Sequence, residues 1–458
     1  MSRSRFRWWL LSVLLFAFLL RAWNLGGKSL WADEAFAVWN AERTPAEIRA
    51  ETHDNHPPLF YLMLHEWISV SRHESWLRLP SVFASMLSLP LAFALGRHLF
   101  GKKTAWTALL LLAVAPLSIW YAQETWMFIF VAPFALSIAL GLARQGRSGG
   151  LLIFMGLAGG LYFNYAIIPL WVILSSLWLV AWWRNGRSGK QLAIWLAASG
   201  AAWLASIPLW PHLALVIGRL STIFFFANIR DQFGLPDLGG LVYLLGLIGL
   251  GIATFIAGTL WRKLGERPSL YRAVTLIILA GFIIVTLLTP IPRLYSLKRI
   301  VVTGWPLVTI LAAVLISRLD PVSSRRVRAG ALALSLAAAC IALWFVPKDD
   351  WRGAVNYINQ HSAPGDVVWL APSSGQIPYN YYQPVIPPMV GVNLIDDPPA
   401  AEIWNIAERQ PGTPIPNGLI ESWLDENRPL LEAIPFYRLE VRHYGIPDPP
   451  GGSEPPGG

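Results

Sequence analysis

The segment SLWADEAFAVWN, residues 29–40, places two adjacent carboxylates, Asp33 and Glu34, among aromatic and aliphatic side chains. It follows a first apolar segment, Trp8–Leu20, closely along the chain. The 458 residues are 55% hydrophobic and only 14% charged, whereas a soluble protein carries about 25% charged residues. The composition therefore predicts a polytopic membrane protein, with an acidic pair just after its first apolar helix.

Apolar segments long enough to cross a bilayer recur along the chain, because a span needs about 20 apolar residues. Ser148–Trp183 is too long for one helix and is expected to form two, with a turn near Asn164, Tyr165 and Pro169. The segments together predict about eleven transmembrane helices: Trp8–Leu20, Leu79–Gly96, Thr104–Gln123, Thr125–Ala143, Ser148–Trp183 as two, Gln191–Trp210, Leu238–Trp261, Ala273–Ile291, Ile300–Ser317 and Ala329–Pro347.

The first segment has the arginine-rich start of a signal peptide, but LLRAWNLGG after it offers no small-x-small cleavage site. We therefore expect a retained helix whose flanking arginines snorkel toward the headgroups. The basic loops fall on one side if the N-terminus is cytoplasmic, as the positive-inside rule requires: Arg3/Arg5/Arg7, Arg97/Lys102/Lys103, Arg144/Arg147, Arg184/Arg187/Lys190, Arg262/Lys263/Arg267/Arg272 and Arg318/Arg325/Arg326/Arg328.

The same agreement argues that Pro57–Val70 does not cross the membrane and forms an amphipathic helix on its outer surface. The net charge of +9 could suggest binding to nucleic acid. The basic residues, however, lie in short loops expected on the cytoplasmic side, so we predict no nucleic-acid partner. The lone Cys340 excludes an intrachain disulfide. The expected location is the inner cell membrane.

An odd number of crossings places the C-terminal part on the extracytoplasmic side. DWRGAVNYINQHSAPGDVVWLAP, from residue 350, predicts a short helix, a Pro-Gly turn and a buried strand. The sequence therefore divides into a membrane module (1–347, with a catalytic first outer loop at 23–78), a small α/β domain (348–443) and a disordered Pro/Gly-rich tail (444–458).

Further polar residues gather on the predicted outer face. HDNH begins the surface helix with His53, Asp54, Asn55 and His56, WYAQETWMF carries Tyr121 and Glu124, and PIPRLYSLKR carries Arg293, Lys298 and Arg299. Each group has a plainer interpretation: a solvated N-cap for the acidic pair, a helix boundary for Glu124 and a surface-helix start for the histidines. The three cations oppose the positive-inside rule, so they suggest an anionic partner such as a lipid phosphate.

These residue types suit glycosyl transfer, because a carboxylate can deprotonate an acceptor hydroxyl while cations stabilise a departing phosphate. RAWNLGGKSLWADEAF, HPPLFYLMLHEW, WLRLPSVFASMLSLPLAFALGRHLFG, WYAQETWMF and DWRGAVNYI resemble the bacterial GT-C glycosyltransferases. The nearest resemblance is to protein O-mannosyltransferase-like proteins (family 39) and lipid A aminoarabinose transferases. It implies transfer, with inversion, from a polyprenyl-phosphate-linked sugar.

The resemblance also implies roles for single residues. Asp33 corresponds to the catalytic base, Glu34 to its neighbour and Glu124 to a second acid. His56 takes the place of a basic residue that contacts lipid phosphate, and Asp54, Tyr121, Arg293, Lys298 and Arg299 complete the expected substrate site. The chain departs from its relatives at QETWMF, at Asn164-Tyr165 in place of His-Tyr, and at KRIVVTGWP.

Two other functions remain open from the sequence. A flippase or transporter of lipid-linked sugars would need polar residues deep within its helices, and a membrane-anchored binding protein would use its aromatic C-terminal domain. The residues do not distinguish a lipid, glycan or protein acceptor, nor one sugar from another. They demand no cofactor and leave a divalent cation open.

Overall fold

The computed structural model describes residues 3–50, 54–144, 146–186, 188–223, 246–256, 259, 280–287, 295–371, 375–389, 401–409 and 418–446. The chain forms two compact units, and each is described by itself. Unit 1 comprises Met1–Trp23, Thr44–Trp67 and Leu77–Val346, and unit 2 comprises Asn24–Arg43, Ile68–Trp76 and Pro347–Gly458. The first loop, Asn24–Arg43, thus belongs with the C-terminal part of the chain.

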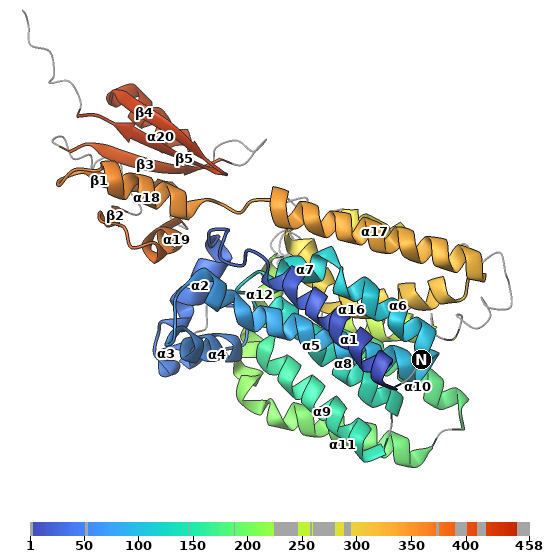
Figure 1. The fold of residues 1–458 in the computed structure, drawn as a ribbon. Helices are drawn as coiled ribbons and strands as arrows, with labels where there is room; N and C mark the ends of the chain where they lie inside the picture. Colours follow the sequence, from blue (N-terminus) through green and yellow to red (C-terminus); the bar gives the residue numbers. More distant parts are fainter. Residues whose placement is uncertain are drawn as a thin grey trace, which may run out of the picture. The chain divides into compact units, whose positions relative to one another are not determined.

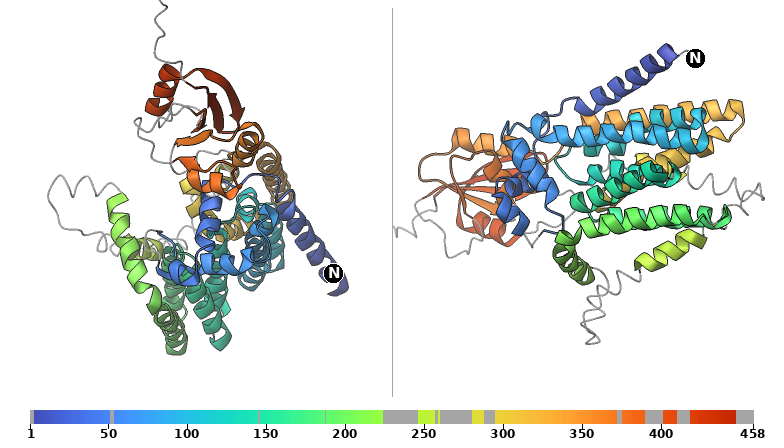
Figure 2. Two further views of the ribbon diagram at one scale, coloured as in Figure 1. Left: turned by 90° about the vertical axis from the view of Figure 1, so that its left-hand side faces the viewer. Right: turned by 90° about the horizontal axis from the view of Figure 1, so that it is seen from below.

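Unit 1 is a bundle of helices that run side by side (Figures 1 and 2). Within it α8 packs on α9, α9 packs on α11, and α16 packs on α6 and α8. Its helices are α1 (Arg3–Ala22), α3 (Pro45–Ala50), α4 (Leu59–Ile68), α5 (Glu74–Phe100), α6 (Lys102–Ala113), α7 (Pro116–Ala122), α8 (Phe128–Arg144), α9 (Gly146–Phe163), α10 (Ile167–Arg184), α11 (Gly189–Ala205), α12 (Trp210–Ile223), α16 (Tyr295–Ser317) and α17 (Pro321–Phe345).

The described residues contain four helices that are long and apolar enough to span a membrane, or up to six if each of two bent pairs is one span. This confirms a helical membrane protein, while the count of about eleven stays a prediction. Much of the expected spans Leu238–Trp261 and Ala273–Ile291 lies outside the described residues. The predicted division near Asn164 is confirmed, because α9 ends at Phe163 and α10 begins at Ile167. Within Pro57–Val70 the structure forms the ten-residue α4, which is too short to cross a bilayer. Its place on the outer surface stays a prediction.

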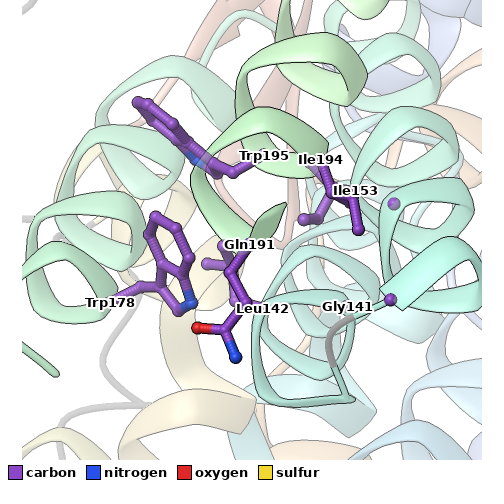
Figure 3. Close-up of a pocket in the computed structure, with 9 residues that line it drawn as sticks. Gly141, Leu142, Ile153, Trp178, Gln191, Ile194 and Trp195 are labelled. Carbon is purple, nitrogen blue, oxygen red and sulfur yellow. The ribbon is translucent and has the colours of Figure 1, made fainter. Parts of the chain in front are cut away.

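Glycines allow α8 and α9 to approach closely. A Cβ built on Gly141 would lie 2.6 Å from the carbonyl oxygen of Gly149, and one built on Gly149 would lie 2.5 Å from that of Gly141. Small residues at such crossings let helix backbones pack tightly where lipid offers no hydrophobic driving force. Next to this crossing, Figure 3 shows a pocket among α8–α11 that holds at most one water molecule and is too small for a substrate.

The expected single span Thr104–Gln123 is instead broken into α6 and α7, which meet at 51°. Pro116 begins α7 and has no N–H to donate to the Leu112 carbonyl, which accepts instead from Ala115 N at 3.3 Å. Arg21 of α1 supplies donors at this break: Nη2 lies 3.0 Å from Leu112 O and Nη1 lies 2.9 Å from Ala113 O. Its Nε donates to Ser85 Oγ at 2.9 Å. Arg21 is fully buried, so the prediction that it snorkels is wrong.

Unit 2 is a mixed α/β domain around a five-stranded sheet of order β2-β1-β3-β5-β4. β1 is parallel to β2 and β3, while β5 is antiparallel to β3 and β4. Its elements are α2 (Ala32–Ala41), α18 (Trp351–His361), β1 (Val367–Ala371), α19 (Gln376–Tyr381), β2 (Pro388–Met389), β3 (Ile403–Glu408), α20 (Gly418–Asn427), β4 (Leu430–Phe436) and β5 (Leu439–Tyr444). The small C-terminal α/β domain is thus confirmed. Its predicted start at residue 348 and the predicted disorder of residues 444–458 stay predictions.

The predicted helix, turn and strand after residue 350 are also confirmed. Asp350 caps α18 through Gly353 N at 3.0 Å, Gly365 takes a φ of 106° in the turn, and β1 follows. Trp351 and Trp404 contribute to the core between α18 and one face of the sheet. Trp369 and Leu424 contribute to the core between α20 and the other face.

We expect Arg21→Met to destabilise the bundle by about 2 to 4 kcal/mol, because the carbonyls of Leu112 and Ala113 lose their buried hydrogen bonds to the guanidinium. The measurement is thermal unfolding of the purified protein in detergent. Arg97→Met, at an exposed arginine of α5, is the matched control and should change the melting temperature little. Equal losses for the two variants would contradict a role for Arg21 at the break.

Candidate active site

The acidic pair begins α2, whose N-cap is Trp31. A helix N-terminus favours negative charge, so both Asp33 and Glu34 sit where the helix dipole stabilises them. Asp33 is partly exposed, whereas Glu34 is fully buried. A solvated N-cap therefore does not describe Glu34.

Glu34 forms a buried ion pair with Lys348 inside unit 2. Lys348 Nζ lies 2.8 Å from Glu34 Oε2, and the two side chains are 4% and 0% exposed. Removing charges from water is costly, and a buried pair is tolerated only when each charge has its partner. The pair therefore fixes the first turn of α2, which carries Asp33, against the start of the C-terminal segment.

A second set of contacts holds the chain just before α2. Arg352 Nη2 lies 2.7 Å from Glu74 Oε1 and 3.0 Å from the Gly26 carbonyl oxygen. The Tyr382 hydroxyl accepts from Leu30 N at 2.7 Å and lies 3.2 Å from Glu74 Oε1. Burial raises the pKa of Tyr382 to about 12, so its hydroxyl keeps its proton and donates to Glu74. Arg352, from the motif DWRGAVNYI, and Tyr382 thus hold the loop that precedes Asp33 in place.

A cleft of about 340 Å³ opens beside α2 and is lined by rings, amides and charges. Its lining includes Ala35 and Trp39 of α2 and Gln376 and Tyr381 of α19. On a helix, Asp33 points about 200° from Ala35 and about 120° from Trp39, so it faces away from both. The cleft is therefore not the place where Asp33 would meet a reacting hydroxyl.

Unit 1 contains a separate polar cluster around His56. The His56 ring lies edge-on to Trp126 and Phe128, with centroids 5.6 and 5.5 Å away, and Asn164 Nδ2 lies 3.5 Å from His56 Nδ1. Burial lowers the pKa of His56 below its ordinary value, and the nearby charge of Asp54 opposes this only in part. The imidazole is therefore neutral at pH 7 and can donate a hydrogen bond, but it brings no positive charge.

His212 joins this cluster from α12. Its Nε2 lies 3.0 Å from the Asp54 carbonyl oxygen and its Nδ1 lies 2.9 Å from the Tyr165 hydroxyl. A carbonyl oxygen only accepts, so Nε2 carries the proton and, in the neutral ring, Nδ1 accepts from Tyr165. The Asp54 carboxylate accepts from the Tyr61 hydroxyl. Asp54 is therefore held in place by two hydrogen bonds, one from His212 to its carbonyl oxygen and one from Tyr61 to its carboxylate.

Glu124 lies between α7 and α8 and is 1% exposed. Its charge acts on Lys298 of α16, which is 5% exposed and whose Nζ lies 5.9 Å from the Trp120 ring centroid. The adjacent Gln123 donates to the Trp23 carbonyl oxygen at 2.8 Å and so ties this loop to the end of α1. Glu124 and Lys298 thus form a second charged group within unit 1.

The structure therefore gathers the expected site residues into separate groups. Asp33 and Glu34 belong to unit 2, whereas Asp54, His56, Tyr121, Glu124, Lys298 and Arg299 belong to unit 1. Arg293 and His53 lie outside the described residues. Sequence reasoning missed Lys348, Arg352, Glu74, Tyr382 and His212. The quoted motif DWRGAVNYI carried a signal for Arg352, but nothing near Lys348 indicated Glu34 as its partner.

We expect Lys348→Met to cost about 3 to 5 kcal/mol in unfolding free energy, because it leaves Glu34 as a buried charge without its partner. Adding Glu34→Gln should recover much of the loss. Thermal unfolding of the single and double variants measures the coupling. Arg72→Met, which breaks the exposed ion pair with Glu42, should cost less than about 1 kcal/mol; strictly additive losses at Glu34 and Lys348 would contradict a coupled pair.

We expect His56 to lower stability in acid. Its pKa is lowered in the folded state, so below about pH 6.5 the unfolded chain binds the proton more readily and folding is penalised. His56→Gln should reduce the fall in melting temperature between pH 7.5 and pH 5.5. The exposed His361→Gln is the control, and an unchanged pH dependence in His56→Gln would refute the effect.

No protein-family model and no curated protein matches the chain. Among solved structures, the apo oligosaccharyltransferase of Archaeoglobus fulgidus aligns with a TM-score of 0.53 and 12% identity, over 88% of this chain and 70% of that one. AglB from the same organism, in complex with an inhibitory peptide and a dolichol-phosphate, aligns with a TM-score of 0.51 and 11% identity, over 93% and 68%.

ArnT from Cupriavidus metallidurans, bound to undecaprenyl phosphate, aligns over 95% of this chain and 98% of that one, at 12% identity and a TM-score of 0.46. That score is too low to establish a shared fold by itself. The two oligosaccharyltransferase structures of Archaeoglobus fulgidus both align with a TM-score above 0.5, so this chain shares their fold. The expected fold class, a mainly helical membrane protein with a small C-terminal α/β domain, is thereby confirmed.

Proposed function

We propose that the chain is an inverting membrane glycosyltransferase that takes its sugar from a polyprenyl-phosphate-linked donor. The observation that carries the proposal is the fixed position of Asp33. Its helix turn is held by the buried Glu34–Lys348 pair, and the preceding loop is held by Arg352, in a chain with a GT-C fold. A base held in place by such contacts meets the geometric need of general base catalysis.

In the proposed step an acceptor hydroxyl oxygen attacks the anomeric carbon of the donor. The new carbon–oxygen bond forms on the face opposite the phosphate, the bond to the phosphate oxygen breaks, and the hydroxyl proton passes to the Asp33 carboxylate. The departing polyprenyl phosphate takes the electron pair and gains one negative charge. Lys298 and Arg299, with Arg293, are proposed to stabilise that charge.

The other expected residues take supporting roles. The ion pair with Lys348 favours a positioning role for Glu34 over direct contact with the acceptor. His56 donates a hydrogen bond to the donor phosphate as a neutral imidazole, with Asp54 and Tyr121 near the donor site. Glu124 supports the acceptor or balances the cations, and the proposed site faces the extracytoplasmic side of the inner membrane. The acceptor is a lipid, glycan or protein.

We expect Asp33→Asn to lower sugar transfer by at least about 100-fold, since a positioned base contributes about 100- to 10,000-fold. The assay follows release of polyprenyl phosphate from a panel of polyprenyl-phosphate sugars, with purified protein and membrane extract as the acceptor source. Donor binding should persist in the variant. Glu47→Gln, at an exposed carboxylate of α3, is the control and should retain activity.

A folded Asp33→Asn protein with wild-type turnover would remove Asp33 from the role of base. If the wild type binds donors but releases no polyprenyl phosphate with any acceptor extract, the transferase proposal fails. Movement of intact donor across a vesicle membrane would then favour the flippase alternative.

A further inference from the structure

Three potential metal ligands meet at one end of the sheet in unit 2. Asp366 and Glu402 each precede one of two adjacent parallel strands, β1 and β3, whose pairing begins at Val367 and Ile403. His443 lies on β5, directly opposite Trp404. One ligand atom from each of Asp366, Glu402 and His443 lies within 4.8 Å of the other two. Neighbouring strands therefore bring together residues that are far apart in the sequence.

The three side chains are held in position by their neighbours. Asp366 Oδ2 accepts from Trp404 Nε1 at 2.9 Å and from Ala363 N at 2.8 Å. The His443 ring stacks on Trp404 with centroids 3.7 Å apart and planes 7° from parallel, and its Nε2 lies 2.8 Å from Glu402 Oε2. Such supporting contacts orient the side chains that bind the ion in metal sites. The stacked ring leaves His443 little freedom to rotate away from the carboxylates.

The ligand set indicates the class of metal. An imidazole nitrogen favours zinc and other late transition metals, whereas calcium and magnesium prefer oxygen ligands alone. Zinc binds nitrogen and carboxylate oxygen at about 2.0 to 2.2 Å, which places tetrahedral ligands about 3.4 Å from one another. The observed spacings, 2.8 Å between His443 Nε2 and Glu402 Oε2 and no more than 4.8 Å within the group, lie on either side of that value. The His443 and Glu402 side chains are 15% and 38% exposed, so an ion can reach them.

We propose that Asp366, Glu402 and His443 form a binding site for Zn²⁺ or a similar transition-metal ion in unit 2. This site is distinct from the residues proposed for sugar transfer. The ion replaces the proton between His443 and Glu402, and three protein ligands leave a fourth position for water. Because Asp366 and Glu402 directly precede β1 and β3 and His443 lies on β5, the bound ion ties together three neighbouring strands.

The test uses the full chain in detergent, stripped with a chelator and titrated with Zn²⁺ by calorimetry. We expect one equivalent of Zn²⁺ to be lost, or its affinity to fall at least about 100-fold, in His443→Ala, because even outer-shell changes cost 10- to 100-fold. Zn²⁺ should also raise the melting temperature of the wild type but not of this variant. His361→Ala, at an exposed histidine of α18, should bind as the wild type does.

Asp366→Asn keeps an oxygen to accept from Trp404 Nε1 while removing the charge, so it tests the site even if His443→Ala fails to fold. Loss of the same equivalent in Asp366→Asn supports the site. If the wild type binds no Zn²⁺, or if Asp366→Asn retains wild-type binding, the proposal is overturned. Binding of Mg²⁺ as tight as that of Zn²⁺ would overturn the assigned class of metal.

Discussion

The buried ion pair between Glu34 and Lys348 is the constraint on which the arrangement around Asp33 depends. The two residues are 314 positions apart in the sequence and are almost fully removed from solvent. Neither charge is tolerable in that place without the other. The first turn of α2 and the start of the C-terminal segment must therefore come together during folding. The position of Asp33 thus depends on residues of the C-terminal segment as well as on its own helix.

The helical bundle obeys a related constraint on polar groups. In an apolar environment, a backbone carbonyl without a hydrogen-bond donor destabilises the fold, because no water molecule is present to donate to it. Pro116 removes one backbone donor where α6 gives way to α7, and Arg21 of α1 donates hydrogen bonds to the Leu112 and Ala113 carbonyls there. A charged residue inside the bundle thus stabilises a break in a helix.

Local patterns in the sequence predicted the local structure well. Apolar length located the helices, the polar pair at Asn164 and Tyr165 located the turn between α9 and α10, and DWRGAVNYI predicted α18. Pairings over long distances could not be predicted, because nothing in a single sequence says which strand or helix end lies beside another. Arg21 shows the difference: its place at a helix end suggested snorkelling, although Pro116 already marked a break that needed donors.

The same distinction applies to the proposed site. Asp33 was recognisable because its motif is local, whereas Lys348 and His212 acquire meaning only through partners far away in the sequence. His443 is a similar case, since its neighbours Asp366 and Glu402 lie just before two other strands, β1 and β3.

The charges of the polar clusters limit how they could serve the proposed reaction. The departing phosphate would gain a negative charge, yet burial keeps His56 neutral, and its neighbour Asn164 adds no charge. Compensation must then come from cations on another element, and Lys298 and Arg299 on α16 are the described residues that fit. Glu124 acts on Lys298 and balances part of that charge before the donor binds. In this scheme the His56 cluster orients the donor, and the cations of α16 stabilise its departing phosphate.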